Sequence, residues 1–107
     1  MTQDRARAAQ VADLIIAGND QVDLAHALRA LGERGYDNVL AEGGPGVAAQ
    51  LASADLLDEL CITLSPVLTG GDAGRILNGH PIEPPTRLEL HRVLESESFL
   101  FLRYRRR

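Results

Sequence analysis

The stretch that decides the fold is VLAEGGPGVAAQL, residues 39–51. It begins with a short apolar run, passes through a glycine pair, and continues with residues that favour a helix. An apolar run of this length with little polar alternation is typical of a strand covered on both sheet faces. Pro45 suits the first position of a helix, where its missing N–H has no intrahelical partner to lose. The stretch therefore predicts a buried strand at 38–42 and a helix at about 46–54.

The residues before this stretch show the same alternation of strand and helix. Residues 11–17 read VADLIIA, a compact apolar run that ends at Gly18 and predicts another buried strand. Apolar side chains then recur at helical spacing over 22–34, with Asn19 and Asp20 as turn and cap residues before them. Because about twenty residues separate the two strands, we expect a parallel strand–helix–strand unit with a right-handed crossover. A short helix is also expected at 4–10.

The second half of the chain changes character. Residues 57–65, LDELCITLS, predict a third strand that Pro66 ends. A turn-rich region follows, and two more strands are expected at 87–95 and 99–105 as an antiparallel hairpin. The expected fold class is therefore α/β, with a mixed sheet in which a βαβ unit is followed by antiparallel strands.

Composition limits the classes of protein and partner. The chain has 107 residues, of which 45% are hydrophobic and 24% charged, as expected for a single globular domain spanning 1–107. Its net charge of −4 argues against a broad nucleic-acid surface. No apolar run approaches the ~20 residues that span a bilayer, and no secretory leader is recognisable. We therefore expect a cytoplasmic protein without a membrane or nucleic-acid partner.

Few side chains support other chemistry. Cys61 is the only cysteine, which excludes an intrachain disulfide and a cysteine-based metal site, and in an apolar strand we expect it in the core. His26 is expected on a helix surface, and neither His80 nor His91 is paired with a second ligand or a nucleophile. No metal site and no hydrolase chemistry are therefore expected. The arginines that close the sequence are expected to form a solvated tail.

Residues 42–46, EGGPG, are the strongest candidate for a binding site. They lie between a predicted strand and a predicted helix, at the sheet edge where ligands of α/β proteins bind. With Gly44 as N-cap, we expect the amides of Gly46, Val47 and Ala48 to lack intrahelical partners and to suit a phosphate. The spacing of a dinucleotide-binding fingerprint and the lysine of a P-loop are both absent. On pattern alone, the glycine pair fits a plain tight turn as well as a binding site.

A second glycine-rich segment follows the third predicted strand. Residues 65–71 read SPVLTGG and could form a loop over a bound ligand. The same residues could also serve only to turn the chain. The pattern leaves both readings open.

Three stretches together resemble a known family. In their order and spacing, these stretches resemble the reductase domain of bacterial riboflavin-biosynthesis deaminase-reductases. They are VLAEGGPGVAAQL at 39–51, LLDELCITLSPVLTGG at 56–71 and GRIL at 74–77. The resemblance implies a dihydrofolate-reductase-like fold. It covers nearly the whole chain, but only about the second half of the family domain.

The resemblance also implies roles for individual residues. Glu42 would contact the substrate. Family members often carry threonine after the proline, where this chain has Gly46, so backbone amides would have a larger share in phosphate binding. Catalytic residues cannot be named. The residues expected to contact the cofactor, NADPH, are Gly43, Gly44, Pro45, Gly46, Val47, Ala48 and Gln50.

The implied reaction is hydride transfer from NADPH to a ribosylamino-pyrimidine phosphate, of the 5-amino-6-(5-phosphoribosylamino)uracil reductase type. The protein would position the nicotinamide against the carbon that is reduced. A homo-oligomer, most simply a dimer, is expected. Two alternatives stay open: another reductase on the same fold, such as a dihydrofolate reductase, and a non-catalytic fragment that acts only in binding or assembly.

Overall fold

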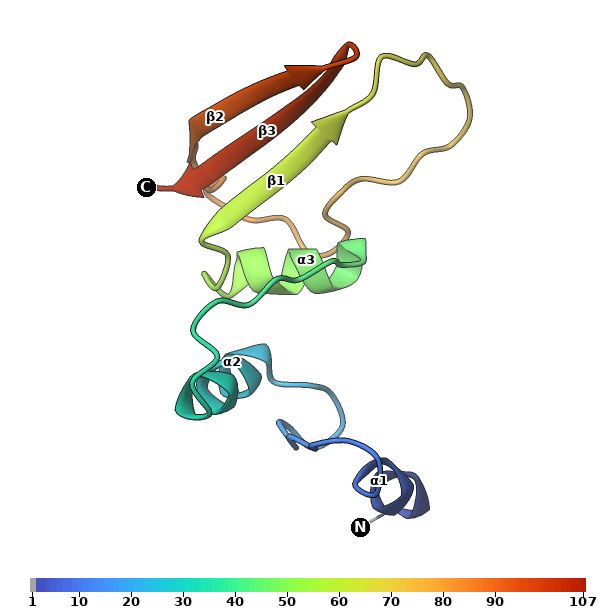
Figure 1. The fold of residues 1–107 in the computed structure, drawn as a ribbon, viewed down its shortest axis with the longest axis vertical. Coiled ribbons are helices and arrows are strands. Elements are labelled where there is room, and N and C mark those ends of the chain that lie inside the picture. Colours follow the sequence, from blue (N-terminus) through green and yellow to red (C-terminus); the bar gives the residue numbers. More distant parts are fainter. Residues whose placement is uncertain (1) are drawn as a thin grey trace. The chain divides into compact units, whose positions relative to one another are not determined.

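The computed structural model describes residues 2–107, which fall into two compact units, Met1–Leu40 and Ala41–Arg107. Figure 1 shows helices alone in the first unit, and one helix with a three-stranded sheet in the second. Among the described residues, no helix has both the length and the apolar character needed to cross a membrane.

The first unit contains α1 (Gln3–Ala8) and α2 (Leu24–Glu33), which confirms both predicted helices. The cap of α2 is Asp23, whose Oδ1 accepts a hydrogen bond of 2.9 Å from the His26 amide. The prediction of a cap at Asn19 and Asp20 was therefore wrong. These residues lie in the turn after Gly18, and Gly18 itself has φ +97°. The Asp23 N–H closes this turn by donating to the Ala17 carbonyl.

The predicted strands at 11–17 and 38–42 are not formed, and this corrects the expected βαβ unit. Residues 10–12 instead continue the turns that end α1. Segment 38–42 follows α2 without helical or strand structure. A strand exists only through hydrogen bonds to a neighbouring strand, and within residues 2–107 neither segment has such a neighbour. Both segments are apolar, as the prediction required, but they are not fully buried: Val11 is 87% exposed and Leu40 is 82% exposed.

The second unit contains α3 (Pro45–Ser53), β1 (Glu59–Leu64), β2 (Leu88–Ser96) and β3 (Phe99–Arg106). The strands form an antiparallel sheet in the order β1-β3-β2, which confirms the third predicted strand and the hairpin. Glu97 and Ser98 connect β2 to β3 with φ values of 50° and 68°. Positive φ at both positions is typical of the tight turns whose twist matches that of a hairpin.

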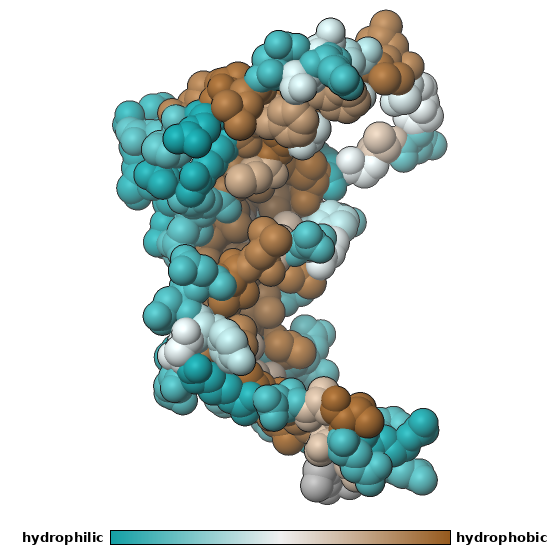
Figure 2. All heavy atoms as spheres, in the orientation of Figure 1, coloured by the Kyte–Doolittle hydropathy of each residue, from teal (hydrophilic) through white to brown (hydrophobic). Residues whose placement is uncertain are grey.

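The sheet has one largely apolar face and one mixed face. The register pairs Leu60 with Tyr104 and Ile62 with Leu102 on the apolar face. Cys61 pairs with Arg103 on the opposite face and is exposed, so the prediction that it lies in the core was wrong. Figure 2 shows that apolar residues also reach the surface elsewhere, and Leu68 and Leu94 of the second unit are examples.

The arginines near the end of the sequence do not form the solvated tail that was expected. Arg103 and Arg105 belong to β3, and both donate to Glu59 of β1. Two of these bonds, each 2.7 Å long, come from Arg103 alone and form a bidentate pair. Arg107 pairs with Glu89 of β2. The basic residues therefore connect the central strand to both of its neighbours.

Candidate functional site

The first turn of α3, with the glycines before it, is the strongest candidate site, and we refer to residues 43–48 as the cradle. Gly44 is the N-cap, with φ −74° and ψ −162°, and Pro45 is the first helical residue, as predicted. No side chain caps this end of the helix. The positive end of the helix dipole is therefore offered by backbone groups alone.

Of the three helix amides expected to be free to bind a ligand, those of Gly46, Val47 and Ala48, two are free. The Ala48 N–H donates to the Gly44 carbonyl at 3.0 Å, which corrects the expectation for this amide. In the part of the chain that the structure describes, Gly46 and Val47 have no acceptor for their N–H groups. Adjacent free amides at a helix N-terminus are suited to an oxyanion such as phosphate.

The glycines of the cradle leave open space. Gly43 has φ +93°, a conformation that other residues rarely adopt, and its peptide bond to Gly44 is cis. A Cβ added at Gly43, Gly44 or Gly46 would have no atom within 4 Å. Packing inside this chain therefore does not require glycine at Gly44 or Gly46, and a ligand can approach the backbone there.

The remaining predicted site residues lie close to the cradle in sequence. Glu42 directly precedes Gly43, is exposed, and makes no side-chain hydrogen bond or ion pair with any described residue. Gln50 is exposed on α3, and the helical repeat puts it on the same face as Gly46, four residues earlier. Val47 is 38% exposed, whereas Ala49 and Leu51 are buried. The helix therefore directs one face inward and leaves Gln50 accessible.

The glycine-rich segment at 65–71 begins a long loop that returns to the cradle. The loop leaves β1 after Leu64 and has no helix or strand before β2 (Figure 1). Midway along this loop, the Asn78 N–H donates to the Pro45 carbonyl at 3.0 Å. A Cβ added at Gly79 would lie 2.9 Å from the Cβ of Ala49. Asn78 and Gly79 lie in the region that the sequence shows only as turn-rich, because a contact across some thirty residues leaves no local pattern.

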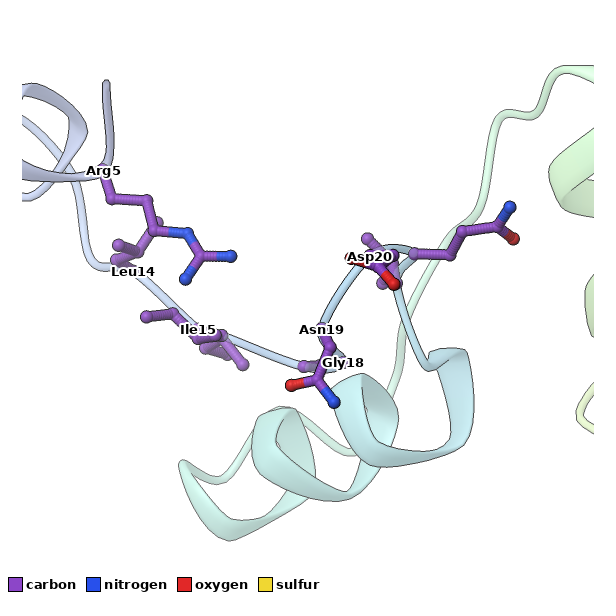
Figure 3. Close-up of a pocket in the computed structure, with 10 residues that line it drawn as sticks. Arg5, Leu14, Ile15, Gly18, Asn19 and Asp20 are labelled. Atoms are coloured by element: carbon purple, nitrogen blue, oxygen red, sulfur yellow. The ribbon is translucent and has the colours of Figure 1, made fainter. Parts of the chain in front are cut away.

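The described residues also form two shallow hollows. One, of about 200 Å³, runs along residues 14–22 of the first unit, and Figure 3 shows Arg5 near Leu14 at one end and Asn19 at the other. The second, of about 310 Å³, lies on the mixed face of the sheet, where Arg92 and Phe101 contribute to its lining. No cradle residue lines either hollow.

Two titratable groups of the sheet have shifted pKa values, for different reasons. The hydrogen bond from Arg103 lowers the pKa of Glu59 below its usual value, and Arg105 lowers it further. Loss of hydration lowers the pKa of His91, and the charges of Arg105 and Arg103 add to this effect. Among residues 2–107, no group of three or more histidine, cysteine or acidic side chains could hold a metal ion. The sheet therefore offers charge pairs, and the cradle remains the best candidate for ligand binding.

Comparisons with known proteins find relatives of this chain by sequence and by structure. A family model described as "RibD C-terminal domain" matches residues 1–100. A 2,5-diamino-6-ribosylamino-4(3H)-pyrimidinone 5′-phosphate reductase of Methanothermobacter thermautotrophicus is 30% identical over 97 residues, which cover 87% of this chain and 45% of the relative. The reductase of the same name from Archaeoglobus fulgidus is 30% identical over 81 residues, which cover 75% and 37%. The chain thus spans less than half the length of these curated relatives.

Solved structures support the fold. RibD of Acinetobacter baumannii superposes with a TM-score of 0.76 at 21% identity, covering all of this chain and 30% of the larger one. A pyrimidine reductase-like protein of Corynebacterium diphtheriae superposes with a TM-score of 0.68 at 24% identity, covering 99% and 46%. These similarities confirm the α/β class and the dihydrofolate-reductase-like architecture for this portion of the domain.

Proposed function

Because this chain belongs to the RibD C-terminal domain family, we propose that it forms the cofactor-binding part of an NADPH-dependent reductase of riboflavin biosynthesis. The substrate class is a ribosylamino-pyrimidine 5′-phosphate, in keeping with the names of the curated relatives. The active species is a cytoplasmic homo-oligomer, most simply a dimer. The curated relatives are longer than this chain. Strands and substrate contacts that correspond to their remaining residues complete the active site.

The observation that carries the proposal is the cradle. The free amides of Gly46 and Val47 lie at the positive end of a helix, and no atom would lie within 4 Å of a Cβ added at Gly46. These groups match the charge and size of a dinucleotide's phosphates. The cradle amides suit a phosphate, and both NADPH and NADH carry the pyrophosphate. The preference for NADPH over NADH is therefore inferred from the family alone.

Bound NADPH supplies a hydride for the sugar carbon of the substrate. The residues of this chain bind and orient: the Gly46 and Val47 amides hold a cofactor phosphate, and Gln50 contacts the cofactor from the same helix face. Glu42, one residue before the cradle, accepts a hydrogen bond from a polar group of the pyrimidine or ribose. Holding both reactants in place contributes to the rate by making their encounter effectively unimolecular.

Amide NMR spectra of the chain during titration with NADPH test the proposal. We expect the resonances of Gly46 and Val47 to shift first and most, with Gly32 of α2 as an internal reference that does not move. Shifts spread over the sheet but absent from the cradle would refute it. Turnover assays with the pyrimidine phosphate and with dihydrofolate, in the presence of the complementary half of the domain, distinguish the two substrates.

A further inference from the structure

We propose that Asn78 and Gly79 form a positioning clip, which fixes the cradle against the end of the 65–77 loop and thereby sets the affinity for the cofactor. The clip is a backbone device. It consists of the hydrogen bond from the Asn78 N–H to the Pro45 carbonyl and of the close contact between Gly79 and Ala49. This inference rests on the proposed function, because it assumes that the cradle binds a cofactor phosphate.

The clip contacts α3 at two residues one helical turn apart. Pro45 is the first residue of α3, and Ala49 lies one turn later with only 5% of its surface exposed. Both belong to the helix whose free amides form the cradle. A contact at these two residues therefore fixes the position of the helical turn that carries Gly46 and Val47.

The loop makes few other contacts with the described residues. Residues 65–76 are exposed, and a Cβ added at Gly70, Gly71 or Gly74 would have no atom within 4 Å. No side-chain hydrogen bond or ion pair among residues 2–107 involves this loop. The clip is therefore the point at which the loop is secured to the helix.

Gly79 leaves no room for a Cβ next to Ala49. Two Cβ atoms at 2.9 Å are closer than the ~3.5–4.0 Å at which carbon atoms attract. A Cβ is fixed by its backbone and cannot rotate away, so an alanine at this position must displace the chain by roughly 0.5–1 Å. Since Ala49 is buried, the exposed loop is the part that moves, and the bond from Asn78 to Pro45 weakens.

Four variants of the full chain test the clip by calorimetric titration with NADPH, together with thermal unfolding. Gly79→Ala should raise the Kd by roughly tenfold, about the loss of one hydrogen bond to a charged group. Gly74→Ala makes the same chemical change in the same loop, in open space, and should leave the Kd unchanged. Asn78→Ala should also leave it unchanged, because only the backbone of Asn78 takes part.

The double variant Ala49→Gly/Gly79→Ala separates positioning from stability. Removing the Ala49 methyl relieves the contact and should restore the wild-type Kd, although glycine within α3 lowers the thermal stability further. A Gly79→Ala protein that binds like the wild type, or a double variant that still binds weakly, would overturn the clip. If Gly79→Ala does not fold, the double variant alone decides between these outcomes. A wild-type chain that does not bind NADPH refutes the proposed function, and the clip with it.

Discussion

Replacing Gly44 with serine should stabilise the protein and weaken cofactor binding at the same time. Gly44 is the N-cap of α3 and already has the extended conformation in which serine caps a helix. A Cβ at this position would meet no atom within 4 Å, so the substitution creates no clash in the chain. The serine hydroxyl would accept a hydrogen bond from the Gly46 or Val47 amide, the same groups that we assign to the cofactor phosphate.

The two effects have opposite signs and can be estimated. Serine in place of glycine at an N-cap adds a few tenths of a kcal/mol of stability, which raises the Tm by roughly 1–3 °C for a unit of this size. Loss of one amide–phosphate hydrogen bond costs about 1.5–3 kcal/mol and raises the Kd for NADPH by roughly 10- to 100-fold. Gly44→Val, which adds bulk without a cap, should weaken binding and also lower the Tm.

Thermal unfolding and isothermal titration of the same preparations measure both effects. Gly32→Ala, an open position within α2, is the matched control, and it should raise the Tm by relieving the cost of a helical glycine without changing the Kd. A Gly44→Ser protein that is more stable but binds NADPH as tightly as the wild type would show that the cradle amides do not hold the phosphate.

The remaining predictions concern the cofactor, completeness and pH. Gly46→Thr restores the hydroxyl that family members often carry, and we expect it to lower the Kd for NADPH several-fold in the same titration. Oxidation at equal concentrations of the two cofactors should be faster with NADPH, and faster use of NADH would contradict the inherited specificity. The chain alone should self-associate, because Val39 and Leu40 are exposed and their backbone forms no hydrogen bond within residues 2–107. It should not turn over the pyrimidine phosphate, because it spans less than half the length of the curated relatives. A monomeric, active chain in light scattering and absorbance assays would refute this. Because Arg103 lowers the pKa of Glu59 in the folded state, this pair stabilises the fold above the carboxyl's unfolded pKa of about 4.3, and the contribution is lost as the pH falls through the lower, folded value. Urea unfolding should therefore show a deficit for Glu59→Gln at neutral pH that disappears in acid, and a deficit independent of pH would contradict the assignment.

Local signals were sufficient to predict the helices and the antiparallel sheet. Pro45 after Gly44 defines the start of α3, and the apolar spacing over 22–34 defines α2, since capping and periodicity act within a few residues. The hairpin of β2 and β3 was predicted for the same reason, because its strands are close together in sequence.

Features that depend on distant partners were not predicted correctly. Residues 11–17 have the composition of a buried strand, but a strand requires a neighbour, and their own sequence does not supply one. The same limit explains the errors at Cys61 and Arg103, because the pairing register decides which face of a strand is exposed. The contact of Asn78 with Pro45 was missed because it joins two turns that look independent in sequence.

The strand order β1-β3-β2 has a consequence for synthesis on the ribosome. The central strand, β3, follows both of its neighbours in the chain, so β1 and β2 are made before either has a partner. The nascent sheet can assemble only after Phe99–Arg106 has left the exit tunnel, and until then β1 presents an apolar, unpaired segment to chaperones. A stop codon that removes β3 would therefore abolish the whole sheet, whereas the loss of an edge strand would leave a hairpin or a pair.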